Sequence, residues 1–339
     1  MPHSRPPIKS LPRRRFLLSG AVLLGGLLTA DVTLRQPQAL QIEKHILPLA
    51  KMPEGKEIRL IQLSDLHLRT SQGYFEQVAH MVSTLRPDVI LLTGDYLEQS
   101  RNLEGVLKFL RLLHAPAGIF AVQGNWEYWA RLEGENLRRQ FRRADVSLLI
   151  SERRDLQVHG VPLSILGVDY PSPADQVSRL VKGASLDRVN LMLSHVPAFN
   201  HQLLDKRIDL VLAGHTHGGQ VRLPLLPPLY LPRFSGSFVA GFYPAGFAKV
   251  PLYVNRGLGT SLLPVRFMCS PEITLFRLVS RLPAHAASHD SPAKTPALSS
   301  TAKNSACQDS VLRHTKPDPD RGGPRSSAHA RLPQDLPVT

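Results

Sequence analysis

Residues 58–95 read IRLIQLSDLHLRTSQGYFEQVAHMVSTLRPDVILLTGD and contain the pattern that decides the fold. An apolar run at residues 58–64 is followed by helical periodicity at 75–85 and by a second apolar run at 89–93. Short apolar runs bounded by turn residues predict buried strands, and a helix between two of them predicts a crossover connection. The stretch therefore predicts a βαβ unit.

The alternation of apolar runs and helical patterns continues toward the C-terminus. A stripe at positions i, i+3, i+4 and i+7 within residues 103–113 predicts another amphipathic helix. Further apolar runs predict strands at residues 118–123, 163–168, 189–194 and 210–213. Because strands that alternate with helices build a largely buried sheet, the sequence predicts an α/β fold class.

The chain has 339 residues and a formal net charge of +14, a value that would suit a nucleic-acid partner. The charge is concentrated at the ends, because residues 1–15 carry +5 and residues 281–339 carry +3. The part between them carries only +6, so we expect no nucleic acid among the partners. The two cysteines, Cys269 and Cys307, are too few for a disulfide scaffold or a Cys-rich zinc module.

The basic N-terminus has the pattern of a targeting segment. Residues 12–18, PRRRFLL, resemble the twin-arginine export signal, and an apolar run follows at residues 16–30. That run has about 15 residues, whereas a bilayer span needs about 20, so its length is typical of a signal peptide. Leu28 is bulky where cleavage requires a small residue, so an uncleaved anchor is the alternative. Residues 1–45 are predicted to be a twin-arginine-like signal or membrane anchor plus a linker, which implies the export machinery as a partner and the cell envelope as the location.

The C-terminal segment differs in composition from the rest of the chain. Residues 281–339 contain no Phe, Tyr or Trp and are rich in Ala, Ser and Pro. Such a segment buries too little apolar surface to offset the entropy lost on ordering, so it is predicted to be a disordered tail. Residues 46–280 remain as the single functional domain.

Polar residues follow five of the predicted strands, each at the point where a strand ends. They include seven side chains of types that bind metals: Asp65, His67, Asp95, Asn125, His195, His215 and His217. Open α/β sheets bind ligands at the edge where the carboxyl ends of their strands meet. We therefore expect these side chains to converge although they are far apart in the sequence.

The residue types and spacings indicate metal ions. Asp65 and His67, like His215 and His217, are two residues apart, and extended backbone points such pairs to the same side. Imidazole together with carboxylate suits Mn, Fe or Zn. The set exceeds what one ion needs and is enough for two ions about 3.5–4 Å apart that share a carboxylate.

The motif order resembles that of the calcineurin-like metallophosphoesterases. Asp-x-His, Gly-Asp, Gly-Asn, a solitary His and Gly-His-x-His occur in that order within residues 56–280. The sequences GHTHGGQ at 214–220, YVNRGLGT at 253–260 and PEITL at 271–275 resemble a subgroup of exported or membrane-associated phosphodiesterases. The resemblance implies a four-layer α/β/β/α sandwich with two divalent metal ions.

The resemblance also assigns the metal ligands. One ion would be held by Asp65, His67 and His217. The other ion would be held by Asn125, His195 and His215, with Asp95 bridging the two. The implied reaction is hydrolysis of a phosphoric ester by a hydroxide that bridges the ions, with Asn125 among the catalytic residues.

One position departs from the family pattern. Many members have Gly-Asn-His-Asp/Glu, in which the His stabilises the reacting phosphate or protonates the leaving group, whereas this chain has Trp126 at that place. Three interpretations stay open: Glu127 substitutes as the catalytic acid, the leaving group needs no acid, or the protein is a weakly active metal-binding homologue. Arg256 is a candidate for binding the phosphate.

Residues 221–234, VRLPLLPPLYLPRF, are apolar and rich in proline and directly follow the last metal motif. They are predicted either to contact the membrane, together with the N-terminus, or to pack on the domain. Membrane contact would suit a phosphodiesterase at the outer face of the cytoplasmic membrane with a phosphodiester or lipid-linked pyrophosphate substrate. The alternative is a hydrolase similar to UDP-2,3-diacylglucosamine pyrophosphatase in lipid A metabolism.

Overall fold

The computed structural model describes residue 26 and residues 29–69, 72–170, 173–199 and 203–281. The twin-arginine-like motif at residues 12–18 and almost all of the predicted disordered tail lie outside the described residues. Within the described part, no helix combines the length and the apolar character needed to cross a membrane.

The first of two six-stranded sheets contains both ends of the folded domain. Its strand order is β1-β12-β2-β3-β4-β5, in which β12 is antiparallel to β2 and the other neighbouring pairs are parallel. The strands are β1 (Gln41–Leu49), β2 (Glu57–Leu63), β3 (Val89–Thr93), β4 (Ile119–Val122), β5 (Val146–Leu148) and β12 (Glu272–Ser280).

The second sheet contains the strands between β5 and β12. Its order is β10-β11-β9-β8-β7-β6, in which the two outer pairs are antiparallel and the inner strands are parallel. The strands are β6 (Glu152–Val158), β7 (Val161–Gly167), β8 (Val189–Leu193), β9 (Leu210–Ala213), β10 (Gly241–Tyr243) and β11 (Leu252–Val254).

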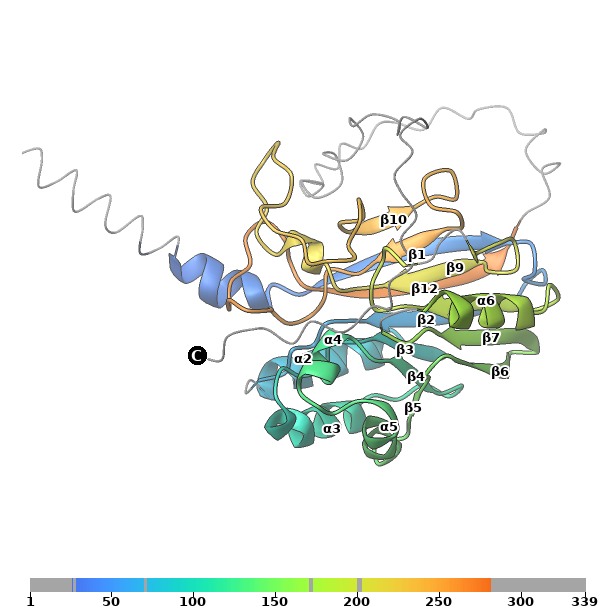
Figure 1. The fold of residues 1–339 in the computed structure, drawn as a ribbon, viewed down its shortest axis with the longest axis horizontal. Helices are drawn as coiled ribbons and strands as arrows, with labels where there is room; N and C mark the ends of the chain where they lie inside the picture. Colours follow the sequence, from blue (N-terminus) through green and yellow to red (C-terminus); the bar gives the residue numbers. More distant parts are fainter. Residues whose placement is uncertain (1–25, 27–28, 70–71, 171–172, 200–202, 282–339) are drawn as a thin grey trace, which may run out of the picture.

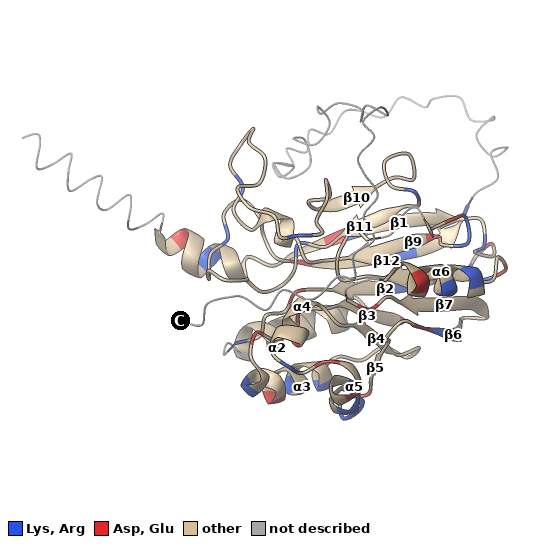
Figure 2. Ribbon diagram, in the orientation of Figure 1, with Lys and Arg blue, Asp and Glu red and all other residues tan. Residues whose placement is uncertain are grey.

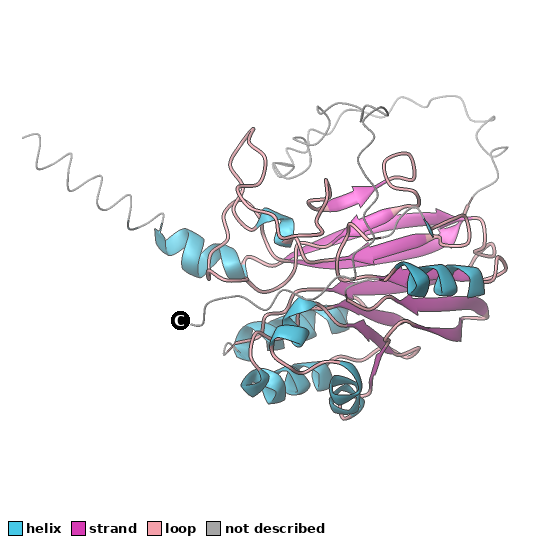
Figure 3. Cartoon of the chain, in the orientation of Figure 1, coloured by secondary structure: helices cyan, strands magenta, loops and turns pink. Residues whose placement is uncertain are grey.

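Helices cover the outer faces of both sheets (Figures 1 and 3). The first sheet packs against α2 (Gln72–Thr84), α3 (Leu103–Leu112) and α5 (Gly134–Arg142), and the second packs against α6 (Ala174–Gly183). Three separate apolar clusters fill the spaces between these layers, one under each set of helices and one between the sheets. The predicted four-layer α/β/β/α sandwich is confirmed.

The short helical elements lie in the connections. They are η1 (Asp31–Arg35), η2 (Gln36–Gln38), η3 (Ser100–Asn102), α4 (Asn125–Trp129) and η5 (His217–Gly219). Two of them, α4 and η5, begin at residues predicted to bind metal.

The six apolar runs in the sequence correspond to β2, β3, β4, β7, β8 and β9. The predicted helices at 75–85 and 103–113 correspond to α2 and α3. The predicted domain start at residue 46 is wrong, because β1 begins at Gln41 and pairs with β12 along nine residues. The chain contacts the domain even earlier, since the backbone N–H of Arg266 donates to the carbonyl of Val32 at 3.0 Å.

Candidate metal centre

Five loops that leave parallel strands meet at one end of the sandwich. The loops after β2, β3 and β4 come from the first sheet, and those after β8 and β9 come from the second. Backbone bonds align neighbouring loops: the N–H of His67 donates to Asp95 at 3.0 Å, and the N–H of Gly214 donates to His195 at 3.0 Å. The backbone N–H of His215 donates to the carboxylate of Asp65 at 3.0 Å and so joins the two sheets.

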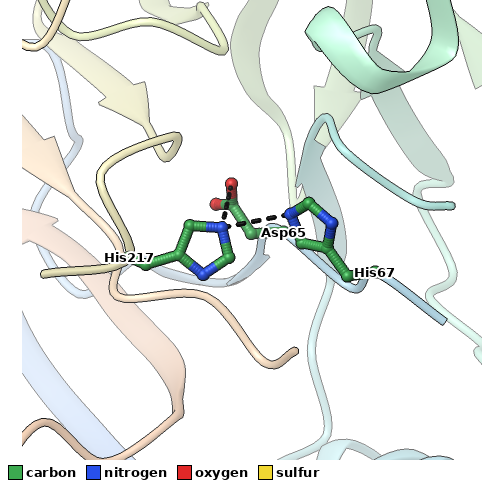
Figure 4. Close-up of side chains that lie close together, drawn as sticks. All are labelled: Asp65, His67 and His217. Atoms are coloured by element: carbon green, nitrogen blue, oxygen red, sulfur yellow. Dashed lines mark hydrogen bonds and ion pairs between the residues drawn. The ribbon is translucent and has the colours of Figure 1, made fainter. Parts of the chain in front are cut away.

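The first group of candidate ligands is Asp65, His67 and His217, all of them buried. His217 Nε2 lies 3.1 Å from His67 Nε2 and 3.4 Å from Asp65 Oδ1. Figure 4 shows the three side chains pointing toward a common point, Asp65 and His67 from the loop after β2 and His217 from η5. The three ligand atoms lie within 4.8 Å of one another, a spacing that one cation can bridge.

The second group is Asp95, His195 and His215, which are also buried. His195 Nε2 lies 3.2 Å from Asp95 Oδ2 and 3.0 Å from His215 Nδ1. Asn125 Oδ1 lies 3.1 Å from the same His195 nitrogen, so the amide joins this group at its edge. The structure thus brings together all seven side chains that the sequence predicted to converge.

Asp95 lies between the two groups. Its Oδ2 is 3.2 Å from His195 Nε2 and 3.6 Å from His67 Nε2. One carboxylate oxygen therefore faces ligands of both predicted ions, which is the position that a bridging ligand requires.

The chemistry of these side chains fits divalent cations. Burial, reinforced by the neighbouring His195, lowers the pKa of His215 to about 4. Burial and the neighbouring His67 hold the pKa of His217 well below its usual value. Both rings are therefore neutral near pH 7, with a lone pair for a metal, and the nitrogen and oxygen donors suit Mn, Fe or Zn.

The backbone at the candidate ligands is strained. Asp65, His67, Asp95, His215 and His217 all have positive φ values, between 40° and 73°. This region is uncommon for residues other than glycine, and such conformations concentrate at functional sites. Five of the six residues in the two groups share it, so the surrounding structure holds the ligand loops in place at an energetic cost.

Two glycines allow the ligand loops to approach closely. A Cβ on Gly124 would lie 2.2 Å from Asp95 Oδ1, and one on Gly214 would lie 2.3 Å from Asp65 Oδ2. Any larger residue at either position would displace a metal-binding carboxylate.

Glu127, predicted as a substitute catalytic acid, is fully buried beneath the ligand loops. Burial and the Asp95 carboxylate raise its pKa to about 7. However, both of its oxygens accept backbone N–H groups: Asp95 at 3.1 Å, Gly124 at 2.7 Å and Tyr96 at 2.7 Å. These contacts make Glu127 a positioning residue for the loops of Asp95 and Asn125.

Trp126 places an aromatic ring beside the first group. Its backbone N–H donates to Asp95 Oδ1 at 3.0 Å, and its ring meets the His67 ring edge-on at a centroid distance of 5.6 Å. Trp129, 55% exposed, continues the aromatic surface at 5.0 Å from Trp126. At the position where the family pattern has a titratable histidine, this chain therefore has an apolar aromatic surface.

Arg256, predicted as a phosphate-binding residue, is 7% exposed and already paired. Its Nη2 lies 2.7 Å from Glu43 and 2.8 Å from Glu272. The side chain lies behind Gly218, where an added Cβ would meet Arg256 Cγ at 3.0 Å. Arg256 therefore lies behind the η5 loop, with its guanidinium held by two carboxylates.

Two residues near the centre were missed by sequence reasoning. Tyr170 follows β7, and its ring lies 6.4 Å from that of His195, a candidate ligand of the second group. Arg266 is fully buried and donates to the carbonyls of Arg256 and Gly257 at 2.8 and 3.0 Å, which fixes the loop next to Asp65. No local pattern distinguishes either residue from a surface Tyr or Arg.

Comparison with known proteins supports the same site. Residues 58–219 match the family model of the calcineurin-like phosphoesterases, and this range contains all seven candidate ligands. The metallophosphoesterase YkuE of Bacillus subtilis is 29% identical over 297 residues, which cover 80% of this chain and 99% of YkuE.

Two further relatives carry more specific names. The phosphodiesterase YaeI of Escherichia coli is 28% identical over 285 residues, which cover 79% of this chain and all of YaeI. The UDP-2,3-diacylglucosamine pyrophosphatase LpxG of Chlamydia trachomatis is 27% identical over 280 residues, which cover 65% of this chain and 83% of LpxG. These matches confirm the family resemblance predicted from the motifs.

Proposed function

This chain is a calcineurin-like phosphoesterase, and so a metal-dependent phosphoric ester hydrolase, and from that premise we propose that it is a phosphodiesterase acting at the outer face of the cytoplasmic membrane. The observation that carries the activity is the pair of buried ligand groups on either side of Asp95. Two divalent ions bound there would neutralise the charge of a phosphate and supply an acidified water as the nucleophile.

The residues around the centre favour a diester over a monoester. Trp126 lies beside His67 of the first ligand group, and Tyr170 lies beside His195 of the second. A phosphodiester carries an organic group on each side of the phosphorus, and both groups would meet an aromatic ring. Arg256 is held by Glu43 and Glu272 and so adds no free charge for a monoester dianion.

The proposed location follows from the sequence of residues 12–30, most of which lie outside the described residues. A twin-arginine-like motif followed by a short apolar run supports export across, or anchoring to, the cytoplasmic membrane. A second candidate function is cleavage of a lipid-linked pyrophosphate, as in the name of LpxG. The observation that favours it is the exposed apolar loop at residues 221–234, in which Leu225 is 96% exposed.

The activity can be tested with the purified full chain, its metal content and a panel of esters. We expect about two Mn, Fe or Zn ions per chain and at least about tenfold faster hydrolysis of an aryl phosphodiester than of the aryl monoester. A chelator should abolish turnover, and Mn²⁺ should restore it. Equal rates on both esters would contradict the diester assignment, and a nucleotide-linked diacylglucosamine as the best substrate would favour the second candidate.

Restoring the residue typical of the family should increase activity. Trp126→His introduces an imidazole beside His67 that can protonate a leaving group, and general acids contribute about 10²–10⁴-fold to such steps. We expect at least about tenfold faster hydrolysis of an alkyl diester, whose leaving group needs a proton, and little change with a nitrophenyl diester.

The matched control for this variant is Trp129→His, which places the same ring further out on the aromatic surface. It should leave the rates on both diesters unchanged. An equal gain from both variants, or a gain confined to the nitrophenyl diester, would show that proton donation at position 126 is not the cause.

A further inference from the structure

One long stretch of the chain carries no acidic residue. Residues 210–271 contain neither Asp nor Glu, although the average for the chain would place five in a segment of this length. The stretch contains five cationic residues, and its loops carry blue but no red segments in Figure 2. It includes the η5 metal loop. Arg222, Arg256 and Arg266 are buried, so the exposed charges of the stretch are those of Arg233 and Lys249, both positive.

The same stretch holds a large share of the exposed apolar side chains. Within the described part of the chain, 15 large apolar side chains are exposed, and most of them fall in residues 210–271. Eight lie on two loops, and six of the eight are between 48% and 96% exposed: Leu225, Leu226, Leu229, Tyr230, Leu262 and Leu263. We call these two loops, residues 221–234 and 260–268, the apolar rim.

Hydrogen bonds tie the two loops of the apolar rim to each other and to the metal centre. The Gln220 side-chain amide donates to the carbonyl of Leu263 at 3.0 Å, and Val221 forms an isolated bridge with Phe267. The carbonyl of Arg233 lies 2.7 Å from Nε2 of His215, one of the candidate ligands. The rim therefore borders the centre directly.

The N-terminal segment reaches the domain beside the same loops. Val32 accepts the backbone N–H of Arg266, Gln36 accepts that of Met268 at 2.8 Å, and Leu34 is 68% exposed. Figure 1 shows η1 and both loops of the apolar rim at the left end of the molecule. The apolar sequence at residues 16–30 thus leads directly into the end of the domain that carries the rim.

We propose that the apolar rim binds the surface of an anionic lipid bilayer and presents the metal centre to lipid-linked phosphate esters. Exposed leucines and a tyrosine beside an exposed cation, Arg233, on loops that carry no acid, are the composition of an interfacial membrane-binding surface. Asp31 of the adjoining η1 is paired with Arg35. Arg233 fits this role, because it is exposed and its guanidinium lies 5.6 Å from the ring of Phe234. The lipid-linked substrate rests on the proposed function, whereas the binding of the bilayer does not.

The test measures co-sedimentation of the full chain with vesicles of phosphatidylcholine alone and of phosphatidylcholine with phosphatidylglycerol. We expect at least about tenfold tighter binding to the anionic vesicles, weakened by salt. Leu225→Ser combined with Leu229→Ser should weaken binding to the anionic vesicles at least about tenfold, because each substitution removes carbon atoms that the leucine would bury in the bilayer. The matched control is Leu112→Ser with Leu186→Ser, which changes two leucines of 51% and 50% exposure outside the rim and should bind as the unchanged chain does.

Three outcomes would overturn the proposal. The rim variant could bind as tightly as the unchanged chain, which would assign membrane binding to the N-terminus alone. Both vesicle types could bind equally. The rim variant could instead dissociate a dimer with no effect on vesicle binding, which would make the rim an interface between two copies. Hydrolysis of a soluble diester, measured in parallel and expected to be unchanged by the rim variant, tests the proposed function separately.

Discussion

Replacing Asp95 with Asn should lower phosphodiester hydrolysis by about 1000-fold or more while the fold stays intact. Asp95 Oδ2 faces His67 and His195 at 3.6 and 3.2 Å, so it is the carboxylate shared by both ligand groups. The amide keeps the shape of the side chain and can still accept the N–H of Trp126, but it removes the negative charge between two cations. The substitution should therefore reduce metal binding and catalysis without destabilising the fold.

The measurement combines turnover of an aryl diester, metal content and far-UV circular dichroism. His215→Ala removes a ligand of the second group only and should give a comparable loss, whereas Asp187→Asn, in an exposed loop, should leave turnover and metal content unchanged. Full turnover by purified Asp95→Asn loaded with Mn²⁺ would refute the bridging assignment.

Glu127→Ala should lower the free energy of unfolding by about 4 kcal/mol and reduce metal content. The substitution removes the acceptor of three N–H groups, those of Asp95, Tyr96 and Gly124, and an unsatisfied buried group costs about 1–3 kcal/mol. Because all three groups belong to the loops that hold Asp95 and Asn125, the destabilisation should be accompanied by misplacement of both ligands.

Urea unfolding of the metal-free and the metal-loaded protein checks this effect. Glu127→Gln retains one acceptor oxygen and should give an intermediate loss, and Glu135→Ala, whose side chain is 62% exposed, should change stability by less than about 0.5 kcal/mol. A Glu127→Ala protein that keeps its stability and metal but loses turnover would restore Glu127 as the catalytic acid.

The sequence predicted the parts of the fold that carry strong local signals. β3 and β9 coincide with apolar runs in the sequence, and each buried strand is followed by a glycine, Gly94 or Gly214, where the chain turns toward the metal centre. The strands β1, β5, β6, β10, β11 and β12 were not predicted, and they include all four edge strands of the two sheets. β6 begins with four consecutive charged residues, and Val158 is its one buried residue, so its sequence pattern resembles that of a loop. β1 contains Lys44 and Pro48, which suit an edge strand but weaken its apolar signal.

The metal centre was predictable because ligand type and strand-end position can both be read along the chain. The roles of Glu127 and Arg256 were not, because they depend on what each side chain meets in three dimensions. Glu127 follows Asn125 in a motif that contains catalytic residues, yet its oxygens face backbone amides. Arg256 follows a strand end as the ligands do, yet Glu43 and Glu272 come from strands at the far ends of the domain sequence.

The position of β12 has a consequence for biosynthesis. β12 lies between β1 and β2 and is the last of the strands to be synthesised. More than 200 residues of sequence separate it from either neighbour, so the first sheet cannot close until these residues have been synthesised. Pairings this distant in sequence form slowly, and until then the unpaired edges of β1 and β2 are open to wrong partners. A ribosome-bound chain that ends before Glu272 therefore cannot complete the sandwich, and native folding of the domain has to await the synthesis of β12.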